Sequence, residues 1–454
     1  MEQSRFLTQG SIWKVLIRFT LPFLLANLLQ ALYGAVDLLV IGKFCSAASV
    51  AAVSTATQVT QIITSLITGF TLAGTVLVGK YAGMEKREKV ERTIGTTVTF
   101  FGLFSFGFTL LSILAIPWVL SLLQVPEASY QEAYSYIFIC CLGVFFICQY
   151  NALSAVLRGY GDSVSPLLFV AVACVFNIVG DIFTVSCLHM GPAGTALSTV
   201  ISQGLSMGIA ILHLNRQKFI FRFSLTSLGM DREILKELIR VGIPVSFQEC
   251  MVRISFLYLT AITNSFGIYV SSAVGIAGKY DVFAMLPATS AANALAALTA
   301  QNLGAGKRQR ARQFLKCALA GAFCCSLLFF LWAQFAPASM IHLFSGDEKV
   351  VQAGIPFFRS CSLDYLAVSV LFCVNGYLNG CEKTLFTMVN CCAGALIIRI
   401  PLLYFLFHSQ VTGLEYYGLV SPASSLIMLG VILGYVIAGH SFRRRGTSPR
   451  FSEV

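Results

Sequence analysis

Of the 454 residues in the chain, 57% are hydrophobic and only 11% are charged, whereas about a quarter of the residues in a soluble domain carry a charge. This composition excludes an ordinary soluble protein and a disordered chain. The net charge of +11 suggests nucleic acid as a partner, but such binding needs a basic face on a folded domain with few apolar spans. We therefore expect the partner to be the lipid bilayer, with no nucleic acid.

Apolar segments of bilayer-spanning length follow one another along the whole chain, separated by short polar connections. They predict an all-α membrane protein with twelve transmembrane helices. The predicted spans are residues 14–41, 49–79, 92–117, 131–157, 165–188, 193–214, 238–266, 270–303, 311–336, 351–379, 384–408 and 414–439.

The basic residues predict the orientation of these helices. An even number of spans places both termini on one side, and Lys and Arg concentrate on the cytoplasmic side. With the N-terminus inside, 25 of the 31 basic residues fall in cytoplasmic segments, and the outer loops carry only Lys43 and Lys349. Both termini are therefore predicted to be cytoplasmic.

The two halves of the chain repeat each other at an offset of about 221 residues. Six spans per half predict two homologous six-helix bundles in the same orientation, which are parallel repeats, around a central cleft. The predicted parts are an N-lobe at 1–214, a cytoplasmic linker at 215–237, a C-lobe at 238–440 and a basic cytoplasmic tail at 441–454. The matching anchors are Leu16-Ile17-Arg18 with Leu238-Ile239-Arg240, Pro22 with Pro244, Gly83 with Gly304, and Leu157-Arg158-Gly159 with Leu378-Asn379-Gly380.

Motifs of catalysis and cofactor binding are missing from the sequence. The fifteen cysteines include adjacent pairs within apolar runs and no C-x-x-C spacing, so we interpret them as packing residues rather than zinc or redox ligands. Gly306-Lys307 resembles the end of a nucleotide-binding loop, but Gln301 and Arg308 break that motif. The sequence therefore predicts no enzyme, no catalytic residue, no cofactor and no structural metal site.

Five acidic residues lie in the interior of predicted spans, away from the span ends, where an ionisable side chain costs at least about 2.5–3.5 kcal/mol. In the second half each acid has a basic residue close to it in sequence. Structural ion pairs and functional groups both remain open interpretations there. The second-half pairs are Glu249 with Arg253, Asp281 with Lys279 and Asp364 with Arg359.

The other two acids, Asp37 and Asp181, have no basic residue in the interior of any span of their half, because Lys14, Arg18 and Arg92 lie at the cytoplasmic ends of their spans. Each must be protonated, bind a cation or be hydrated, because an isolated charge is unfavourable at low dielectric. A rise of 1.5 Å per residue places them about 34 Å and about 24 Å along outward-running helices, so both fall in the outer half of the membrane. We predict a coupling site for a proton or sodium here, with Asn177 as a neighbour; hydrated acids without a coupling role are the alternative.

Polar residues share helix faces with these acids. Gln30 and Tyr33 precede Asp37 at helical spacing, and Asn177 precedes Asp181 by four residues. A further stripe either lines a water-filled cavity or joins neighbouring helices by hydrogen bonds. Its members follow a 4-3-4-3-4 spacing and are Thr57, Gln61, Thr64, Thr68, Thr71 and Thr75.

Pro22 and Pro244 lie at equivalent places early in the first helix of each half. A proline inside a helix removes one backbone hydrogen bond and bends the helix. Pro22 is therefore predicted to bend its helix, either as a fixed kink or as a hinge used in gating.

Several local motifs together resemble the multidrug and toxic compound extrusion (MATE) family, over essentially the whole chain. They are Pro22 with Asp37, Arg158-Gly159-Tyr160-Gly161-Asp162, Asn177 with Asp181, Gly194-Thr195-Ala196, Gly278-Lys279-Tyr280-Asp281 and Gln301-Asn302-Leu303-Gly304-Ala305-Gly306.

The resemblance implies a secondary transporter with a V-shaped cleft, which exports amphipathic, mainly cationic, organic compounds in exchange for protons or sodium. It further implies a monomer in a prokaryotic plasma membrane. The polar first half is most similar to the DinF-like branch. The residues that match that branch are Gln30, Tyr33, Asp37, Asn151, Asn177, Asp181 and Thr199, and the threonine stripe adds Gln61, Thr64 and Thr68 as cleft residues.

Two rival functions remain open at the level of sequence. A flippase for lipid-linked precursors would have the same fold, but it usually needs cationic cavity residues for phosphate groups, and the first half has none within its spans. A membrane-embedded enzyme or receptor is the other rival, and no catalytic constellation supports it. The NorM-like branch uses acids of the second lobe, but Glu249 and Asp364 are offset from its motifs, so we do not assign them that role.

Overall fold

The computed structural model of the chain describes residues 7–123, 125–216 and 229–444. Helices make up nearly all of this described part, and no strand occurs in it. Eleven helices are long and apolar enough to cross a membrane, and a pair bent by 45°, Ser129–Leu142 with Val144–Tyr160, supplies the twelfth span. The predicted all-α architecture with twelve spans is therefore confirmed.

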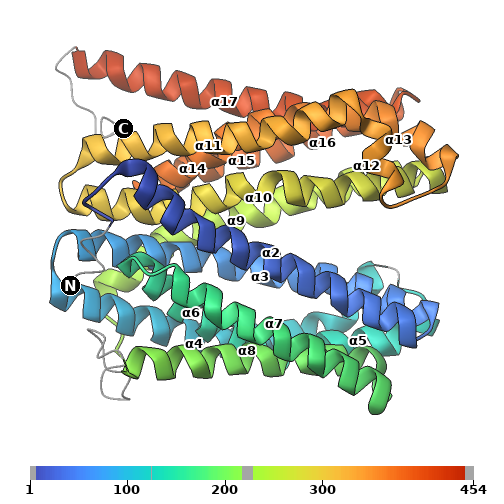
Figure 1. Cartoon of the computed structure of the whole chain (residues 1–454), viewed down its shortest axis with the longest axis horizontal. Coiled ribbons are helices and arrows are strands. Elements are labelled where there is room, and N and C mark those ends of the chain that lie inside the picture. Colours follow the sequence, from blue (N-terminus) through green and yellow to red (C-terminus); the bar gives the residue numbers. More distant parts are fainter. Residues whose placement is uncertain (1–6, 124, 217–228, 445–454) are drawn as a thin grey trace. The chain divides into compact units, whose positions relative to one another are not determined.

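The helices follow the predicted spans closely (Figure 1). Those of the first half are α2 (Ile12–Phe44), α3 (Ala47–Gly83), α4 (Arg87–Leu122), α5 (Glu127–Leu142), α6 (Val144–Tyr160), α7 (Val164–Ile182) with the π-helical segment η1 (Phe183–Cys187), and α8 (Gly191–Arg216). Those of the second half are α9 (Arg232–Asn264), α10 (Ile268–Gly304), α11 (Arg308–Phe335), α12 (Pro337–His342), α13 (Glu348–Cys361), α14 (Leu363–Gly380), α15 (Thr384–Cys392), η2 (Ala393–Arg399), α16 (Ile400–His408) and α17 (Leu414–Arg444).

The fourth span of each half is broken in the middle, which hydropathy did not predict. The break lies at Gly143 between α5 and α6, and at Ser362 between α13 and α14. A β-carbon at Gly143 would collide with the side chain of Val200, so the absence of a side chain permits close packing at this bend. The short helix α12, which begins with Pro337 in its first turn, was also not predicted.

Contacts between helices repeat at the offset seen in the sequence. Gly159 packs against the backbone carbonyl of Thr75, with 2.6 Å between that oxygen and an ideal β-carbon. Gly380 packs in the same way against Ala296, with 2.7 Å. Both members of each pair are 221 residues apart (380 − 159 and 296 − 75), so the two halves share their packing as well as their sequence pattern.

Contacts divide the chain into two compact units. The first contains residues 1–10, 17–246 and 300–307, and the second contains residues 11–16, 247–299 and 308–454. Each unit has a hydrophobic core of its own. Of the predicted linker, residues 217–228 lie outside the described residues, as do residues 445–454 of the predicted tail; the lobe boundaries stay predictions.

The ends of α3 and α10 cross at close range inside the first unit. A β-carbon on Gly83 would collide with the carbonyl oxygen of Gln301, and one on Gly304 would collide with that of Lys80. We call this contact the glycine crossing. Its members are again related by 221 residues (304 − 83 and 301 − 80), so each half contributes the same helix end to it.

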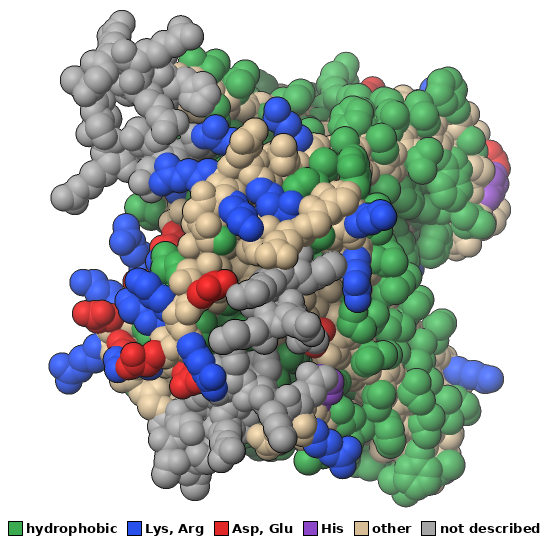
Figure 2. All heavy atoms as spheres, turned by 60° about the vertical axis from the view of Figure 1, so that its left-hand side comes forward, with side chains coloured by type: hydrophobic (Ala, Val, Ile, Leu, Met, Phe, Trp, Pro, Cys, Tyr) green, Lys and Arg blue, Asp and Glu red, His purple; other side chains and the backbone are tan. Residues whose placement is uncertain are grey.

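Charged side chains surround the same end of the first unit. Lys80 Nζ lies 3.4 Å from Glu237 Oε2, and the Tyr81 hydroxyl donates to that oxygen at 2.9 Å. Arg92 lies 3.4 Å from Asp231, the residue before α9. In the space-filling view the Lys and Arg side chains gather on one face, while hydrophobic side chains cover much of the rest (Figure 2). This separation of charged and apolar surface fits a membrane protein.

Candidate functional site

Two carboxyl groups meet in the interior of the first unit. Asp37 on α2 is 6% exposed, and Asp181 near the end of α7 is fully buried. The two side chains lie within hydrogen-bonding reach of each other. One oxygen of Asp37 and both oxygens of Asp181 have no hydrogen-bond donor among the described residues. We call these two residues the carboxyl pair.

The carboxyl pair cannot stay doubly ionised without a compensating charge. Adjacent carboxylates repel, and burial adds a desolvation cost that a nearby cation would otherwise offset. In the described part of the chain neither carboxyl forms an ion pair with Lys or Arg. A single proton shared between them, or one bound cation, would satisfy the unpartnered oxygens, so the geometry suits a site for an exchangeable positive charge.

Sodium fits the donor set as well as a proton does. Hard cations bind oxygen ligands, and a third oxygen is present on Asn177, one helical turn before Asp181. That side chain is 2% exposed, its amide nitrogen donates to Thr199 Oγ1 at 3.2 Å, and its amide oxygen has no partner in the described residues. No cluster of three His, Cys, Asp or Glu side chains suited to a transition metal occurs among the described residues.

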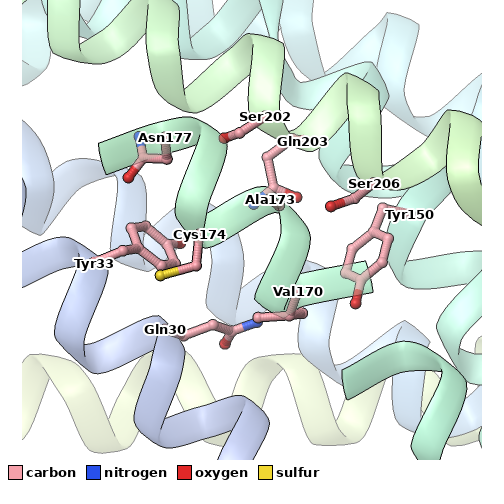
Figure 3. A pocket seen from close by; sticks show the side chains of 10 residues that line it. All are labelled: Gln30, Tyr33, Tyr150, Val170, Ala173, Cys174, Asn177, Ser202, Gln203 and Ser206. Atoms are coloured by element: carbon pink, nitrogen blue, oxygen red, sulfur yellow. The ribbon is translucent and has the colours of Figure 1, made fainter. Parts of the chain in front are cut away.

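A small pocket lies beside these residues within the first unit (Figure 3). Its wall comes from α2, α6, α7 and α8, and it combines aromatic and uncharged polar side chains. The lining residues are Gln30, Tyr33, Tyr150, Val170, Ala173, Cys174, Asn177, Ser202, Gln203 and Ser206. No charged side chain lines it, so its wall offers aromatic rings and neutral hydrogen-bonding groups.

Only some of the residues predicted to bind the ion or the substrate lie at this pocket. Gln30, Tyr33 and Asn177 line it, and Thr199 reaches it through its hydrogen bond with Asn177. Asn151 does not line it, because its amide donates at 2.8 Å to the carbonyl of Ile147 in its own helix. The functional roles of all these residues stay predictions.

The threonine stripe on α3 forms its hydrogen bonds within its own helix. Thr64 donates to the carbonyl of Thr60 at 2.9 Å, and Thr68 donates to that of Thr64 at 2.8 Å. Thr57, Thr71 and Thr75 donate to the carbonyl four residues earlier in the same way. These five hydrogen bonds therefore lie within α3. Thr64, Thr68 and Gln61 are exposed and lie outside the pocket wall.

Pro22 lies within α2, which runs unbroken from Ile12 to Phe44. The side chain is buried, and Phe23 beside it packs under the guanidinium of Arg158 at 4.6 Å from the ring centre. The helix thus continues through the proline, and the predicted bend stays a prediction.

Besides the apolar Val170 and Ala173, five lining residues were not identified from the sequence. Tyr150 directly precedes the predicted Asn151, and its hydroxyl donates to the carbonyl of Pro166 at 3.1 Å. Helical spacing from Asn177 and Thr199 leads to the others, since residues three, four and seven positions apart share a face. They are Cys174, Ser202, Gln203 and Ser206.

Two of the three local ion pairs considered for the second half do not form. Asp281 accepts a hydrogen bond from the Tyr365 hydroxyl at 2.8 Å, while Lys279 is exposed and lies 5.1 Å from the ring centre of Phe344. Asp364 instead faces Arg399, the basic residue whose charge acts most strongly on it. For Glu249, the neighbouring charge is Arg253, one turn along α9.

Two six-helix repeats with a buried carboxyl pair define a polytopic membrane transporter rather than an enzyme. The MatE family profile matches residues 22–183 and, a second time, residues 244–405. The chain belongs to this family, the multidrug and toxic compound extrusion transporters, as its motifs suggested. The two matches are 222 residues apart (244 − 22), which confirms the internal duplication.

Named relatives extend over nearly the whole chain. The "Probable multidrug resistance protein YpnP" of Bacillus subtilis is 27% identical over 394 residues, which cover 87% of this chain and 88% of the relative. The "Multidrug export protein MepA" of Staphylococcus haemolyticus is 19% identical over 408 residues, covering 89% of each. The DinF-like branch within the family stays a prediction.

Solved structures share the fold. One, described as the outward-facing conformation of a multidrug resistance MATE family transporter of the MOP superfamily, superposes with a TM-score of 0.89 over 99% of both chains at 18% identity. A MOP superfamily transporter from Pyrococcus furiosus superposes with a TM-score of 0.87 over 94% of this chain and 96% of that chain, at 19% identity. At these identities the likeness concerns the fold.

Proposed function

We propose that this protein is a cation-coupled antiporter that exports amphipathic organic compounds, cationic ones foremost, in exchange for protons or sodium. The observation that carries the proposal is the carboxyl pair. Asp37 and Asp181 are buried and lie within hydrogen-bonding reach of each other, and one oxygen of Asp37 and both oxygens of Asp181 have no hydrogen-bond donor in the described residues. A pair of this kind holds one exchangeable positive charge more easily than none or two.

Exchange requires that ion and substrate favour different states of the transporter. A ligand shifts a conformational equilibrium only by its difference in affinity for the two states. Binding of a proton or sodium at the carboxyl pair removes the repulsion between Asp37 and Asp181, so it favours the state in which they are close. Substrate that binds the other state is released when the ion binds, and the coupling is reciprocal.

The pocket beside the carboxyl pair supports an aromatic, amphipathic substrate. Tyr33 and Tyr150 offer ring faces, and Gln30 and Gln203 offer amide groups in the same wall. The multidrug names of the relatives YpnP and MepA support the same substrate class.

Orientation and assembly complete the proposal. The basic segments support cytoplasmic termini. The bacterial relatives support a location in the plasma membrane of a prokaryote. We propose that it acts as a monomer, because each coupling and substrate residue comes from one chain.

The test is transport by the purified protein in liposomes. Fluorescent organic cations are followed with an imposed proton gradient, an imposed sodium gradient, or neither. We expect gradient-dependent movement, and we expect Asp37→Asn and Asp181→Asn to abolish it while folded protein remains in the membrane. Gradient-independent retention of every cation tested, or full activity in both variants, contradicts the proposal.

A matched control for these variants is Asp347→Asn. Asp347 is an exposed residue whose carboxylate accepts from Lys349 N at 2.9 Å as the N-cap of α13. Asparagine caps a helix about as well as aspartate. This control makes the same chemical change far from the carboxyl pair, and its transport should equal that of the unaltered protein.

A further inference from the structure

Arg399 is buried inside the second unit, at the end of η2. It is 4% exposed, its Nη1 donates to Ser255 Oγ on α9 at 2.9 Å, and its guanidinium lies 4.3 Å from the ring centre of Phe256. The Nε atom has no hydrogen-bond partner among the described residues. A guanidinium held in this way is a fixed positive charge in an apolar interior.

Two carboxyl groups on other helices lie close enough for this charge to act on them. Asp364 on α14 is 3% exposed, and one of its oxygens has no donor among the described residues. Asp281 on α10 accepts from the hydroxyl of Tyr365. The attraction of Arg399 acts on both carboxyls, although no direct ion pair within 4.0 Å joins it to either. The second unit therefore contains its own cation for its buried acids.

Side-chain burial indicates which residue of the first unit is equivalent to Arg399 in the repeat. An offset of 221 would pair Asp181 with Leu402, but Leu402 is 37% exposed whereas Leu403 is fully buried. The two matches of the family profile end at residues 183 and 405, which is an offset of 222 (405 − 183). At that offset Arg399 takes the place of Asn177, and Leu403 takes the place of Asp181. A guanidinium thus stands where the first unit has an amide, and leucine where it has a carboxyl.

We propose that Arg399 is a tethered cation, which fills the place in the second unit that an exchangeable cation would otherwise take and so confines ion coupling to the first unit. The proposal deepens the antiporter function and rests on it, because coupling is assigned to Asp37 and Asp181. Removing the guanidinium leaves Asp281 and Asp364 without a cation. The vacated site then accepts guanidinium or sodium from solution.

Thermal unfolding of the purified full-length protein tests this site without any transport measurement. The background variant Asp37→Asn with Asp181→Asn removes ion binding at the carboxyl pair. In that background, added Arg399→Ala should make Tm rise with millimolar methylguanidinium or sodium, on the order of 2–4 °C, while the background alone shows no rise. Further addition of Asp364→Asn should abolish the response.

Transport then tests the consequence for coupling. With native Asp37 and Asp181, Arg399→Ala should lower gradient-driven transport on the order of tenfold, and methylguanidinium should restore it. Arg399→Lys should retain more activity than Arg399→Ala because it keeps the charge. The matched control is Lys279→Ala, which removes an exposed lysine of the same unit and should leave transport unchanged.

A double variant that removes both charges distinguishes a folding defect from the proposed role of Arg399. Arg399→Gln with Asp364→Asn leaves neither charge uncompensated, so it should fold and transport better than Arg399→Gln alone. A structural role for Arg399 predicts loss of stability with no response to cations, and that result overturns the proposal. If the Tm response occurs but the unaltered protein transports nothing under any gradient, the antiporter function fails while the cation site stands.

Discussion

The two units differ in how each compensates its buried acids. In the first unit, Asp37 and Asp181 face each other without a basic partner in the described residues. In the second unit, Asp364 faces Arg399, a cation that belongs to the chain. The duplicated halves share their helices and their packing offset, but they compensate their buried acids in different ways. The difference teaches that one half is suited to exchange a positive charge and the other to retain one.

The largest expected effect separates the two units directly. Asp181→Asn should reduce the ion dependence of transport on the order of 100-fold, because a neutral amide cannot release and rebind a proton or sodium. Asp364→Asn should lower the amount of folded protein and leave the ion dependence unchanged, since Arg399 supplies the charge there. Initial transport rates as a function of external pH and sodium measure both. Equal loss of ion dependence in the two variants would contradict this difference between the two units.

A second prediction uses a place where the halves are alike. Gly83→Ala and Gly304→Ala should each destabilise the protein by about 1–3 kcal/mol, because each new methyl group meets a backbone carbonyl in the glycine crossing. Thermal unfolding in detergent measures this. Gly430→Ala is the matched control: nothing lies within 4 Å of its β-carbon, so it should be neutral or stabilising. Strongly unequal effects at Gly83 and Gly304 would show that the crossing is not symmetric.

A third prediction concerns the start of the fifth helix of each half. Asp162 accepts from the backbone N–H groups of Val164 and Ser165 at 3.0 Å, whereas the residue 221 positions later, Lys383, contacts Tyr435. Asp162→Ala should therefore cost about 1–2 kcal/mol, as the loss of a helix cap does. Lys383→Ala should cost less than about 1 kcal/mol, because a cation over a half-buried ring at the end of a flexible side chain contributes little. Thermal unfolding of the two variants measures both losses of stability. A larger loss for Lys383→Ala than for Asp162→Ala contradicts the capping role of Asp162.

The smallest expected effect lies outside the membrane-spanning segments. Backbone N–H groups of Ile234 and Glu233, together with Arg92, hold the pKa of Asp231 below its ordinary value. A lowered pKa in the folded state means that Asp231 stabilises the fold above its unfolded pKa and that this contribution is lost as pH falls through the folded pKa. Asp231→Asn should lower stability by at most about 1 kcal/mol at neutral pH. The difference from the unaltered protein should vanish in acid, and a constant difference across pH would contradict this origin.

Most of the helical architecture could be predicted because long apolar segments are a strong signal in a sequence. The breaks at Gly143 and Ser362 and the π-helical segments η1 and η2 could not be predicted, because apolar composition continues through them. The site was predicted in part. Asp37, Asp181 and Asn177 were found as polar residues in spans, but which helices meet is a tertiary property, so the contact between Asp37 and Asp181 had to come from the structure.

The ion pairs assumed in the second half failed for local reasons. Lys279 and Asp281 are two residues apart on one helix, so their side chains leave on different faces. Arg359 and Asp364 lie on opposite sides of the break at Ser362, which removes the regular helical spacing between them. Arg399 is distant in sequence from both acids, and its inward direction depends on η2. Sequence proximity of opposite charges is therefore a weak guide where a helix is interrupted.

The division of α9 has a consequence for the continuity of the chain. Residues 232–246 of this helix belong to the first unit and residues 247–264 to the second, so the boundary between units runs through a helix and not through the connection that precedes it. If the chain were supplied as two polypeptides, interrupted between α8 and α9, the start of α9 would still have Lys80, Tyr81 and Arg92 to bind. The two fragments should therefore recognise each other, and the covalent link between the halves would be dispensable for their assembly.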